Sequence, residues 1–337
     1  MGIVVLGAAT STVAERSALL ALGFFWPLAG VGRRRRSLRV AALALMIAAA
    51  GCGDDDGAVP DDGAVRDAAP RDGGTGTTDG GGVDSGPRDG GASGTDGCGR
   101  ALDIATATWV PRSIDVGGAA RQFFVWLPTG YDPTRRYPVI YQFHGCSSDP
   151  ARENNNVPLQ NESGADAILV RGRAAGNCWE TATDGPDVPY VDALISTVDA
   201  TWCADTTRRF ATGYSSGSFM THRLACIRGS MLRGVASIAG GQAGTGCTGN
   251  VAALLIHDSD DGTVNISQSE AARDSHLMRN GCDATAPTTP ADHPPCVAYA
   301  GCDADKPVVW CQTSGMDHSR QDDLAAPAFW DFLSALF

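Results

Sequence analysis

The stretch RFATGYSSGSFM, residues 209–220, contains the pentapeptide Gly213-Tyr214-Ser215-Ser216-Gly217. It has the form G-x-S-x-G, which is typical of a nucleophilic serine on a sharp turn between a strand and a helix. The chain holds 42 glycines in 337 residues, so composition alone can also produce this pattern. The segments around the pentapeptide therefore decide its meaning.

An apolar segment precedes the pentapeptide and a helical one follows it. Residues 209–215 are typical of a short strand and residues 216–227 of a helix. The strained turn packs closely against its neighbours, so a side chain at either glycine would clash. Because the helix begins directly after Ser215, its N-terminal amides lie near any negative charge that develops there. We therefore predict that Ser215 is a nucleophile.

Strands and helices alternate through the surrounding sequence. Apolar runs predict strands, and apolar residues at helical spacing predict helices. The predicted strands are 121–128, 137–145, 166–172, 209–215, 234–241, 251–258 and 306–312, and the predicted helices are 188–202, 216–227, 267–280 and 325–337. This alternation predicts an α/β domain with a mostly parallel central sheet and helices on both faces.

A serine nucleophile needs a base, and the base needs an acid that orients it. In a fold of this kind the acid and then the histidine follow the serine, each at the carboxyl end of a strand. His318 follows the last predicted strand and is the predicted base. The acid is left open among Asp258, Asp260 and Asp261, which follow the preceding strand. The remaining histidines suit this order less well and are interpreted as structural: His144, His222, His257, His276 and His293.

Two backbone amides are expected to bind the oxyanion of such a reaction. One is the amide of Ser216, directly after the nucleophile, and the other is that of Cys146, in the loop that begins His144-Gly145. Trp179 is a candidate for the wall of an acyl pocket, and a buried core tryptophan is an equally good interpretation.

The N-terminal part of the chain differs sharply from the rest. Residues 33–52, RRRRSLRVAALALMIAAAGC, have the charged and short apolar regions of a secretory signal. Their end resembles a bacterial lipobox, with Cys52 as the lipidated residue, and cleavage nearby with full secretion is the alternative. Residues 53–97 contain 14 glycines and 11 aspartates and predict a disordered linker. We therefore divide the chain into a signal region 1–52, a linker 53–97 and a folded domain 98–337.

Charge and cysteine usage limit the partners of this domain. The formal net charge of the chain is −12, which argues against binding to nucleic acid. Ten of the eleven cysteines follow the linker, and this even number in an exported domain predicts up to five disulfides whose pairing the sequence leaves open. The chain has no C-x-x-C pair, so we predict no metal site.

Several short motifs together resemble the feruloyl esterase and poly(3-hydroxybutyrate) depolymerase family of α/β-hydrolases. They are HGC at 144–146, CWE at 178–180, WCADTTRRFATGYSSG at 202–217, an H-x-x-x-D at 257–261 and a G-x-x-H at 315–318. The resemblance covers residues 115–337. It implies an exported serine esterase that uses no cofactor. It also implies that the acid is Asp261, four residues after the histidine of its motif, with Asp260 in reserve.

The chain departs from the family pattern near the expected acid and base. Asp258 stands where the family often has glycine, and Met316 and Asp317 stand where it usually has glycines.

The expected function is hydrolysis of a small or oligomeric ester by a monomeric carboxylesterase, with feruloyl or acetyl esters of plant cell-wall polysaccharide as substrates. Depolymerisation of poly(3-hydroxybutyrate) is the alternative within the family. A non-catalytic surface binding lipoprotein on the same fold is the alternative of another class. The only expected contact with a membrane is the lipid on Cys52.

Overall fold

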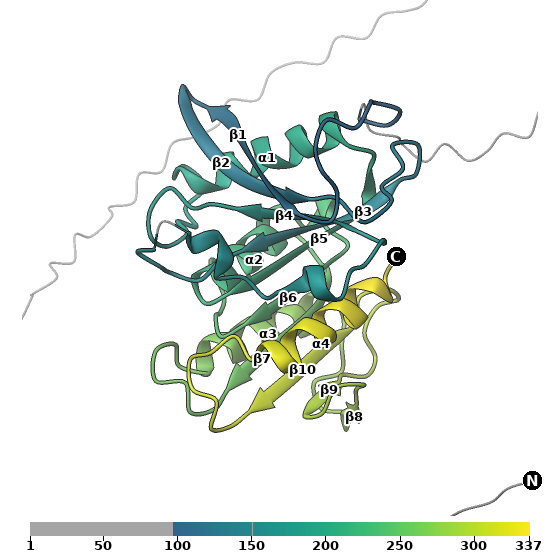
Figure 1. The fold of residues 1–337 in the computed structure, drawn as a ribbon. Coiled ribbons are helices and arrows are strands. Elements are labelled where there is room, and N and C mark those ends of the chain that lie inside the picture. The colour runs from purple at the N-terminus through teal and green to yellow at the C-terminus, as the bar shows by residue number, and fades with distance from the viewer. Residues whose placement is uncertain (1–96, 150) are drawn as a thin grey trace, which may run out of the picture. The chain divides into compact units, whose positions relative to one another are not determined.

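The computed structural model describes residues 97–149 and 151–337, and a ten-stranded sheet runs through this part of the chain (Figure 1). The predicted signal region, Cys52 and all of the predicted linker but Gly97 lie outside the described residues. The strands are β1 Trp109–Val116, β2 Ala119–Trp126, β3 Tyr137–Phe143, β4 Ile168–Gly172, β5 Ala204–Tyr214, β6 Gly234–Ile238, β7 Ala252–Asp258, β8 Thr289–Pro290, β9 Cys296–Ala298 and β10 Val308–Thr313. The α-helices are α1 Asp187–Thr201, α2 Ser216–Ile227, α3 Ser267–Arg279 and α4 Asp322–Ser334, and short 3-10 helices cover Arg152–Asn154, Leu159–Asn161 and Gly229–Met231.

The centre of the sheet is parallel and its two edges are antiparallel. The strand order is β1-β2-β4-β3-β5-β6-β7-β10-β9-β8. Strands β4, β3, β5, β6, β7 and β10 pair in parallel, whereas β1 and β2 at one edge and β9 and β8 at the other pair antiparallel. The carboxyl ends of β5, β7 and β10 therefore lie at the same edge of the parallel region, which brings the loops that follow them together.

Two apolar layers cover the sheet, one on each face. Helices α1, α2 and α3 contribute side chains such as Leu194, Leu224 and Leu277 to one layer. Helix α4 packs on the other face, where Phe329 and Leu333 are fully buried. The strands β3, β4, β6 and β7 are buried along their whole length, because helices or loops cover both of their faces. The predicted mostly parallel sheet with helices on both faces is confirmed.

The main differences from the predicted elements lie at the edges of the sheet. Strand β1, WVPRSIDV, was not expected, because it is polar and contains Pro111. It pairs only with β2, and an edge strand can accommodate a proline, which lacks a ladder donor. Strand β5 starts at Ala204 rather than at residue 209, which the sequence reasoning missed because residues 205–208 are polar and not buried. The short strands β8 and β9 carry too few apolar residues to be recognised.

All ten cysteines after the predicted linker form disulfides. The pairs are Cys98–Cys203, Cys146–Cys178, Cys226–Cys247, Cys282–Cys302 and Cys296–Cys311. The predicted number is confirmed, and the structure supplies the pairing that the sequence left open. Five disulfides in one domain are typical of an extracellular protein.

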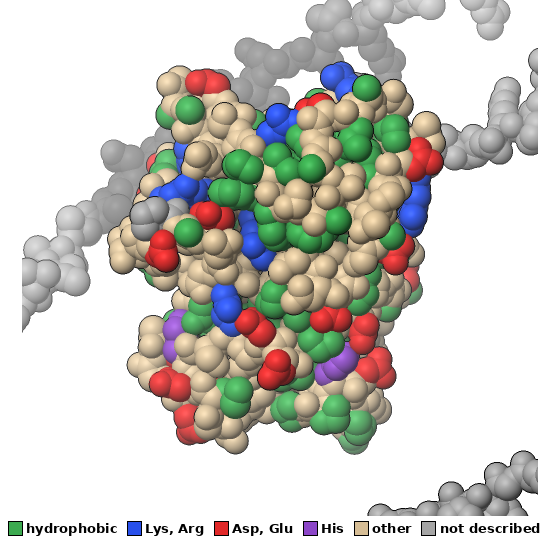
Figure 2. All heavy atoms as spheres, viewed as in Figure 1, with side chains coloured by type: hydrophobic (Ala, Val, Ile, Leu, Met, Phe, Trp, Pro, Cys, Tyr) green, Lys and Arg blue, Asp and Glu red, His purple; other side chains and the backbone are tan. Residues whose placement is uncertain are grey.

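The surface of the domain carries both charges without one dominant basic region on the face shown. Figure 2 shows acidic side chains over the lower part of this face, around β10 and α4, and most of the arginines further up. Within the described part of the chain, none of the helices has the length and apolar character that crossing a bilayer requires.

Two buried histidines, His222 in α2 and His276 in α3, form a hydrogen-bonded chain that ends at β6. The Arg279 guanidinium donates to Nδ1 of His276 at 3.2 Å, and Nε2 of His276 lies 3.1 Å from Nδ1 of His222. Nε2 of His222 lies 2.9 Å from the hydroxyl of Ser237. Since the guanidinium can only donate, the protons sit on Nε2 of both rings, and an additional proton would have no acceptor.

Burial keeps these histidines neutral. It lowers the pKa of His222 to about 3, with a smaller contribution from Arg279, and it lowers the pKa of His276 well below its ordinary value. Burial also lowers the pKa of His144 to about 4. The structural interpretation of these three histidines agrees with their burial and hydrogen bonds.

These histidines predict that the domain loses stability in mild acid. Below a pH of about 6.5 these histidines bind protons in the unfolded chain but stay neutral in the folded chain. The free energy of unfolding therefore falls as the pH decreases towards the folded pKa values. The loss is about 1.4 kcal/mol per pH unit for each histidine. Thermal melts should show a Tm at pH 5 at least about 5 °C below that at pH 7.

The control for this prediction is His222→Gln, which keeps a donor for Ser237 and removes one titrating group. Its Tm should vary less steeply with pH. A Tm that is flat between pH 7 and pH 5 in the unchanged protein would contradict the argument.

Candidate active site

Ser215 lies on a strained turn between β5 and α2. Its backbone has φ 53° and ψ −119°, a conformation that residues other than glycine rarely adopt. The glycines of the pentapeptide allow this turn: a Cβ on Gly213 would lie 2.1 Å from the carbonyl oxygen of Gly217, and one on Gly217 would lie 1.9 Å from that of Phe143. The turn places Ser215 at the wall of a cavity that His318 also lines.

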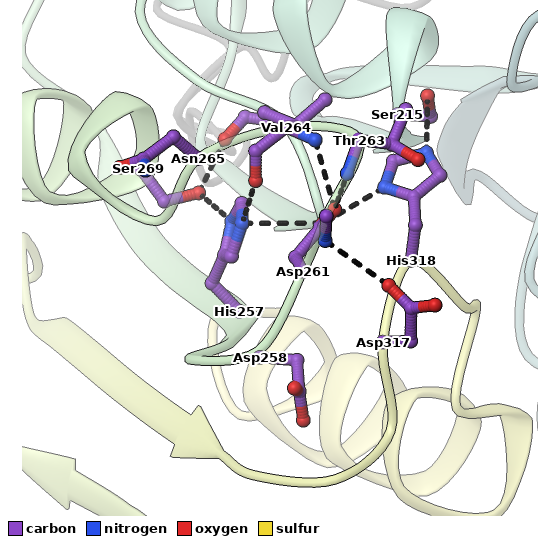
Figure 3. A network of polar contacts seen from close by, with 12 residues as sticks. Ser215, His257, Asp258, Asp261, Thr263, Val264, Asn265, Ser269, Asp317 and His318 are labelled. Carbon is purple, nitrogen blue, oxygen red and sulfur yellow. Dashed lines mark hydrogen bonds and ion pairs between the residues drawn. The ribbon is translucent and has the colours of Figure 1, made fainter. Parts of the chain in front are cut away.

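Figure 3 shows the side chains of Ser215, His318 and Asp261 in one hydrogen-bonded row. Nε2 of His318 lies 2.9 Å from Oγ of Ser215, and its Nδ1 lies 2.8 Å from Oδ2 of Asp261. His318 comes from the loop after β10 and Asp261 from the loop after β7. Both distances suit hydrogen bonds, so the Ser215 hydroxyl can donate to Nε2 while Nδ1–H donates to the carboxylate.

The environment of Asp261 keeps its carboxyl group ionised. Burial raises its pKa, but hydrogen bonds from His318 and from the amides of Val264 and Thr263 outweigh burial, and the pKa is lowered overall. Both amides donate to Oδ1 at 2.8 Å, which leaves Oδ2 for His318. A fixed carboxylate of this kind can orient an imidazole and stabilise its charged form.

The other two candidate acids lie in the same loop and have different partners. Asp260 Oδ2 accepts the amide of Gly315 at 2.8 Å. Asp258 Oδ2 accepts the Thr313 hydroxyl at 2.9 Å and the amide of Met316 at 3.0 Å. Neither carboxylate has a hydrogen bond to His318, so the structure places Asp261 alone of the three beside the imidazole.

Asp258 and Asp317, which differ from the family pattern, form hydrogen bonds between the two loops that carry the acid and the base. We call residues 258–264 the acid loop and residues 313–320 the histidine loop. Asp258 and Asp260 bind the histidine loop as described above, and Asp317 accepts the amide of Gly262 in the acid loop at 3.1 Å. Sequence reasoning missed these contacts because it placed the residues at the ends of two separate strands.

The two candidate oxyanion donors, Cys146 and Ser216, line the same cavity as Ser215 and His318. One short segment contacts the loops of both. Cys178 forms a disulfide with Cys146, and the amide of Trp179 donates to Oγ of Ser216 at 2.8 Å. The Trp179 indole also donates to the carbonyl of His144 at 3.0 Å.

The cavity beside Ser215 has a volume of about 590 Å³, which lies in the usual range for small-molecule sites. Its wall includes the rings of Trp179, Tyr214 and Phe219. Trp179 is only 6% exposed and packs edge-on against Phe143, so it belongs to the core and reaches the cavity at one border. Trp179 is therefore a core residue that also borders the cavity, and its role in an acyl pocket stays a prediction.

Tyr214 and Phe219 are site residues that the sequence reasoning overlooked. The Tyr214 hydroxyl donates to the carbonyl of His318 at 3.1 Å, and its ring lies 5.4 Å from the imidazole. Phe219 lies one helical turn after Ser215. Their positions in and beside the G-x-S-x-G pattern were the signals that could have identified them.

The structure offers no arrangement suited to a metal ion within residues 97–149 and 151–337, where three or more His, Cys, Asp or Glu side chains are nowhere grouped for one. The chemistry that the site can perform with its own residues is that of a serine nucleophile, an imidazole base and a fixed carboxylate.

Comparison with known proteins identifies the family. No protein-family model matches the chain. Feruloyl esterase D from Neurospora crassa is 30% identical to it over 263 residues, which is 70% of this chain and 89% of that protein. This chain belongs to the feruloyl esterase family. It is therefore a serine esterase, as the motifs predicted.

Two further comparisons agree with this membership. A probable feruloyl esterase C from Aspergillus terreus is 29% identical over 230 residues, covering 64% of this chain and 84% of that protein. The solved structure of an acetyl xylan esterase from Aspergillus awamori superposes with a TM-score of 0.56 at 14% identity, covering 67% of this chain and 99% of that one. The predicted α/β-hydrolase fold of this feruloyl esterase family member is confirmed.

The contacts of Cys178 and Trp179 predict that one disulfide matters for rate beyond its effect on stability. Replacing both Cys146 and Cys178 by serine frees the loops of both candidate oxyanion donors. A misplacement of about 1 Å costs on the order of a hundredfold in rate, so kcat for p-nitrophenyl acetate should fall about ten- to a hundredfold.

The matched control is the double serine variant of Cys98 and Cys203, a disulfide at the opposite end of β5. It should lower Tm and leave kcat per folded molecule within about twofold. Equal kcat values for the two double variants would show that the Cys146–Cys178 disulfide has no such effect.

Proposed function

We propose that the protein is an exported esterase that hydrolyses feruloyl or acetyl esters of plant cell-wall polysaccharide. The observation that carries the proposal is the hydrogen-bonded row Ser215–His318–Asp261, which opens on a cavity of about 590 Å³. The relatives named feruloyl esterase support the reaction and the substrate class.

In the proposed mechanism Ser215 attacks the ester carbonyl while His318 takes its proton. Asp261 holds the imidazole in the required tautomer and stabilises the imidazolium that forms. The amides of Cys146 and Ser216 bind the oxyanion of the tetrahedral intermediate. His318 then protonates the leaving alcohol, an acyl-enzyme forms on Ser215, and a water activated by His318 releases the acid.

The cavity favours an aromatic acyl group over acetyl alone. An acetyl group fills a small part of about 590 Å³, whereas a feruloyl group offers an aromatic ring that can pack against Phe219 or Tyr214. The cavity wall also carries polar side chains, including those of Gln242 and Thr181, which suit the hydroxyl and methoxyl groups of the acid or the hydroxyls of a sugar.

The two alternatives are weaker on the same observations. A poly(3-hydroxybutyrate) depolymerase would act by the same chemistry, and no observation at this cavity favours an aliphatic polyester. A non-catalytic surface binding protein would have no use for an ionised carboxylate, an imidazole and a serine at hydrogen-bonding distances.

We further propose that the linker 53–97 tethers the domain and that Cys52 carries a lipid after export. The signal-like segment 33–52 and the glycine- and aspartate-rich composition of the linker support this. The proposed partners are a small or oligomeric ester and, through the lipid, a membrane. We expect a monomer that does not bind nucleic acid.

Ser215→Ala should abolish ester hydrolysis and leave the fold intact. Loss of the nucleophile should lower kcat for p-nitrophenyl acetate at least about a thousandfold. Ser196→Ala is the matched control, because Ser196 lies on α1, donates to a carbonyl of its own helix and does not line the cavity. This variant should retain most of the activity. Retention of most activity by Ser215→Ala, with unchanged near-UV circular dichroism, would refute the assignment of the nucleophile.

A substrate panel separates the proposed substrate class from the alternatives. The protein should release ferulate from methyl ferulate with a kcat/KM above that for aliphatic esters of similar size, because the aromatic ring packs in the cavity. Clearing of a poly(3-hydroxybutyrate) suspension without ferulate release would favour the polyester alternative.

A further inference from the structure

A second imidazole reaches the carboxylate of Asp261. His257 is the next-to-last residue of β7, four residues before Asp261, and the side chains of both are fully buried. Its Nε2 lies 3.3 Å from Oδ2 of Asp261 and 2.9 Å from the carbonyl oxygen of Val264 (Figure 3). The proposed mechanism gives His257 no role.

The neighbours of His257 fix one of its protons. Nε2 faces only a carbonyl oxygen and a carboxylate oxygen, and both can only accept, so Nε2 must carry a hydrogen. Val264 is the nearer acceptor and Asp261 the second. His318 has the opposite requirement, because its Nε2 must accept from Ser215 while its Nδ1–H donates to Asp261. The two imidazoles thus approach the carboxylate through different nitrogens.

His257 also supports the segment that supplies the other donors to Asp261. The amide of Val264 donates to Oδ1 of Asp261, and the carbonyl oxygen of Val264 accepts a hydrogen bond from Nε2 of His257. The ring of His257 therefore fixes the carboxylate directly and fixes the turn whose amides hold it. Without the Nε2–H donor, the half-buried carbonyl of Val264 would lose this partner.

The other nitrogen of His257 connects this turn to the backbone beside the nucleophile. Nδ1 lies 2.6 Å from Oγ of Ser269 in α3, and that hydroxyl also contacts the carbonyl of Gly240 after β6. Gly240 packs against Ser215, since a Cβ on Gly240 would lie 2.7 Å from the Ser215 carbonyl oxygen. Hydrogen bonds through α3 and the packing of Gly240 together therefore connect the carboxylate to the nucleophile turn.

We propose that His257 is a positioning residue for the esterase reaction: it holds Asp261 so that Oδ2 stays in line with Nδ1–H of His318. The proposal rests on the catalytic roles proposed above for Ser215, His318 and Asp261. It gives the histidine of the H-x-x-x-D motif, which sequence reasoning interpreted as structural, a part in the reaction that it exerts through Asp261.

Two substitutions of similar side-chain length distinguish the effect of the Nε2–H hydrogen bond from the effect of filling the space. His257→Gln places an amide N–H near the Nε2 position, and His257→Met fills the space without a donor. The methionine variant should lower kcat for p-nitrophenyl acetate about ten- to a hundredfold with KM within about twofold, and the glutamine variant should recover most of the loss. Rates are taken per folded molecule, with the folded fraction measured by near-UV circular dichroism.

His276→Met is the matched control, because His276 is also fully buried and hydrogen-bonded but lies outside the site. It should lower Tm and leave kcat within about twofold. If His257→Met keeps the kcat of the unchanged protein, or if glutamine is no better than methionine, the proposal is wrong. If His257→Met does not fold, Ser269→Ala replaces it, with an expected loss in kcat of about three- to tenfold and unchanged kcat as the refuting result.

A double-mutant cycle tests whether His257 acts through Asp261. In an Asp261→Ala background, His257→Met should change the residual kcat by less than about twofold, because the group that it positions is absent. A loss equal to that in the unchanged protein would assign His257 a separate structural effect and overturn the proposal. Failure of the proposed function would look different: the unchanged protein would not hydrolyse the ester, or Ser215→Ala would keep its activity.

Discussion

The close approach of α2 to the backbone of β3 and β5 is the constraint on which the site depends. Gly217 lies against the carbonyl of Phe143 and Gly213 against that of Gly217, with no room for a side chain at either position. This contact sets the strained conformation of Ser215 and the start of α2 beside it. Because β3, β5, β7 and β10 are parallel, the loops that carry Cys146, Asp261 and His318 lie at the same edge as that turn.

Hydrogen bonds between the loops then hold them in place. Packing of apolar side chains fixes where the helices and strands lie, but less finely than catalysis requires. The serine, the imidazole and the carboxylate must be positioned to within a few tenths of an ångström. In this protein the acid loop and the histidine loop share hydrogen bonds through Asp258, Asp260 and Asp317. The Cys146–Cys178 disulfide and the amide of Trp179 hold the loops of the candidate oxyanion donors in a similar way.

Most of the fold could be predicted because its central strands are continuous apolar runs. The run at β3 and the pentapeptide after β5 indicated a parallel sheet with a nucleophile turn, and the chain order supplied His318. The choice of Asp261 over Asp258 and Asp260 came from family resemblance. Periodicity could not make this choice, because three aspartates within four positions differ only in where the loop directs them. Strand β1 escaped detection since an edge strand buries one face and tolerates Pro111.

The contacts between loops could not be predicted for a related reason. Hydrogen bonds such as that from Gly262 to Asp317 join residues 55 positions apart, and nothing in the local sequence of either loop identifies its partner. The same holds for His257, whose two nitrogens reach α3 and the acid loop. Its place in a motif was visible from the sequence, but its neighbours were not.

The disulfide between Cys98 and Cys203 fixes where the described part of the chain begins relative to the cavity. It joins the first described residues to the start of β5, whereas Ser215 follows the carboxyl end of that strand. Gly97 and Cys98, the first described residues, therefore lie at the edge of the sheet opposite to the cavity. A probe coupled directly to Gly97 would therefore lie at the far edge of the sheet and leave the opening of the cavity free for a bulky ester.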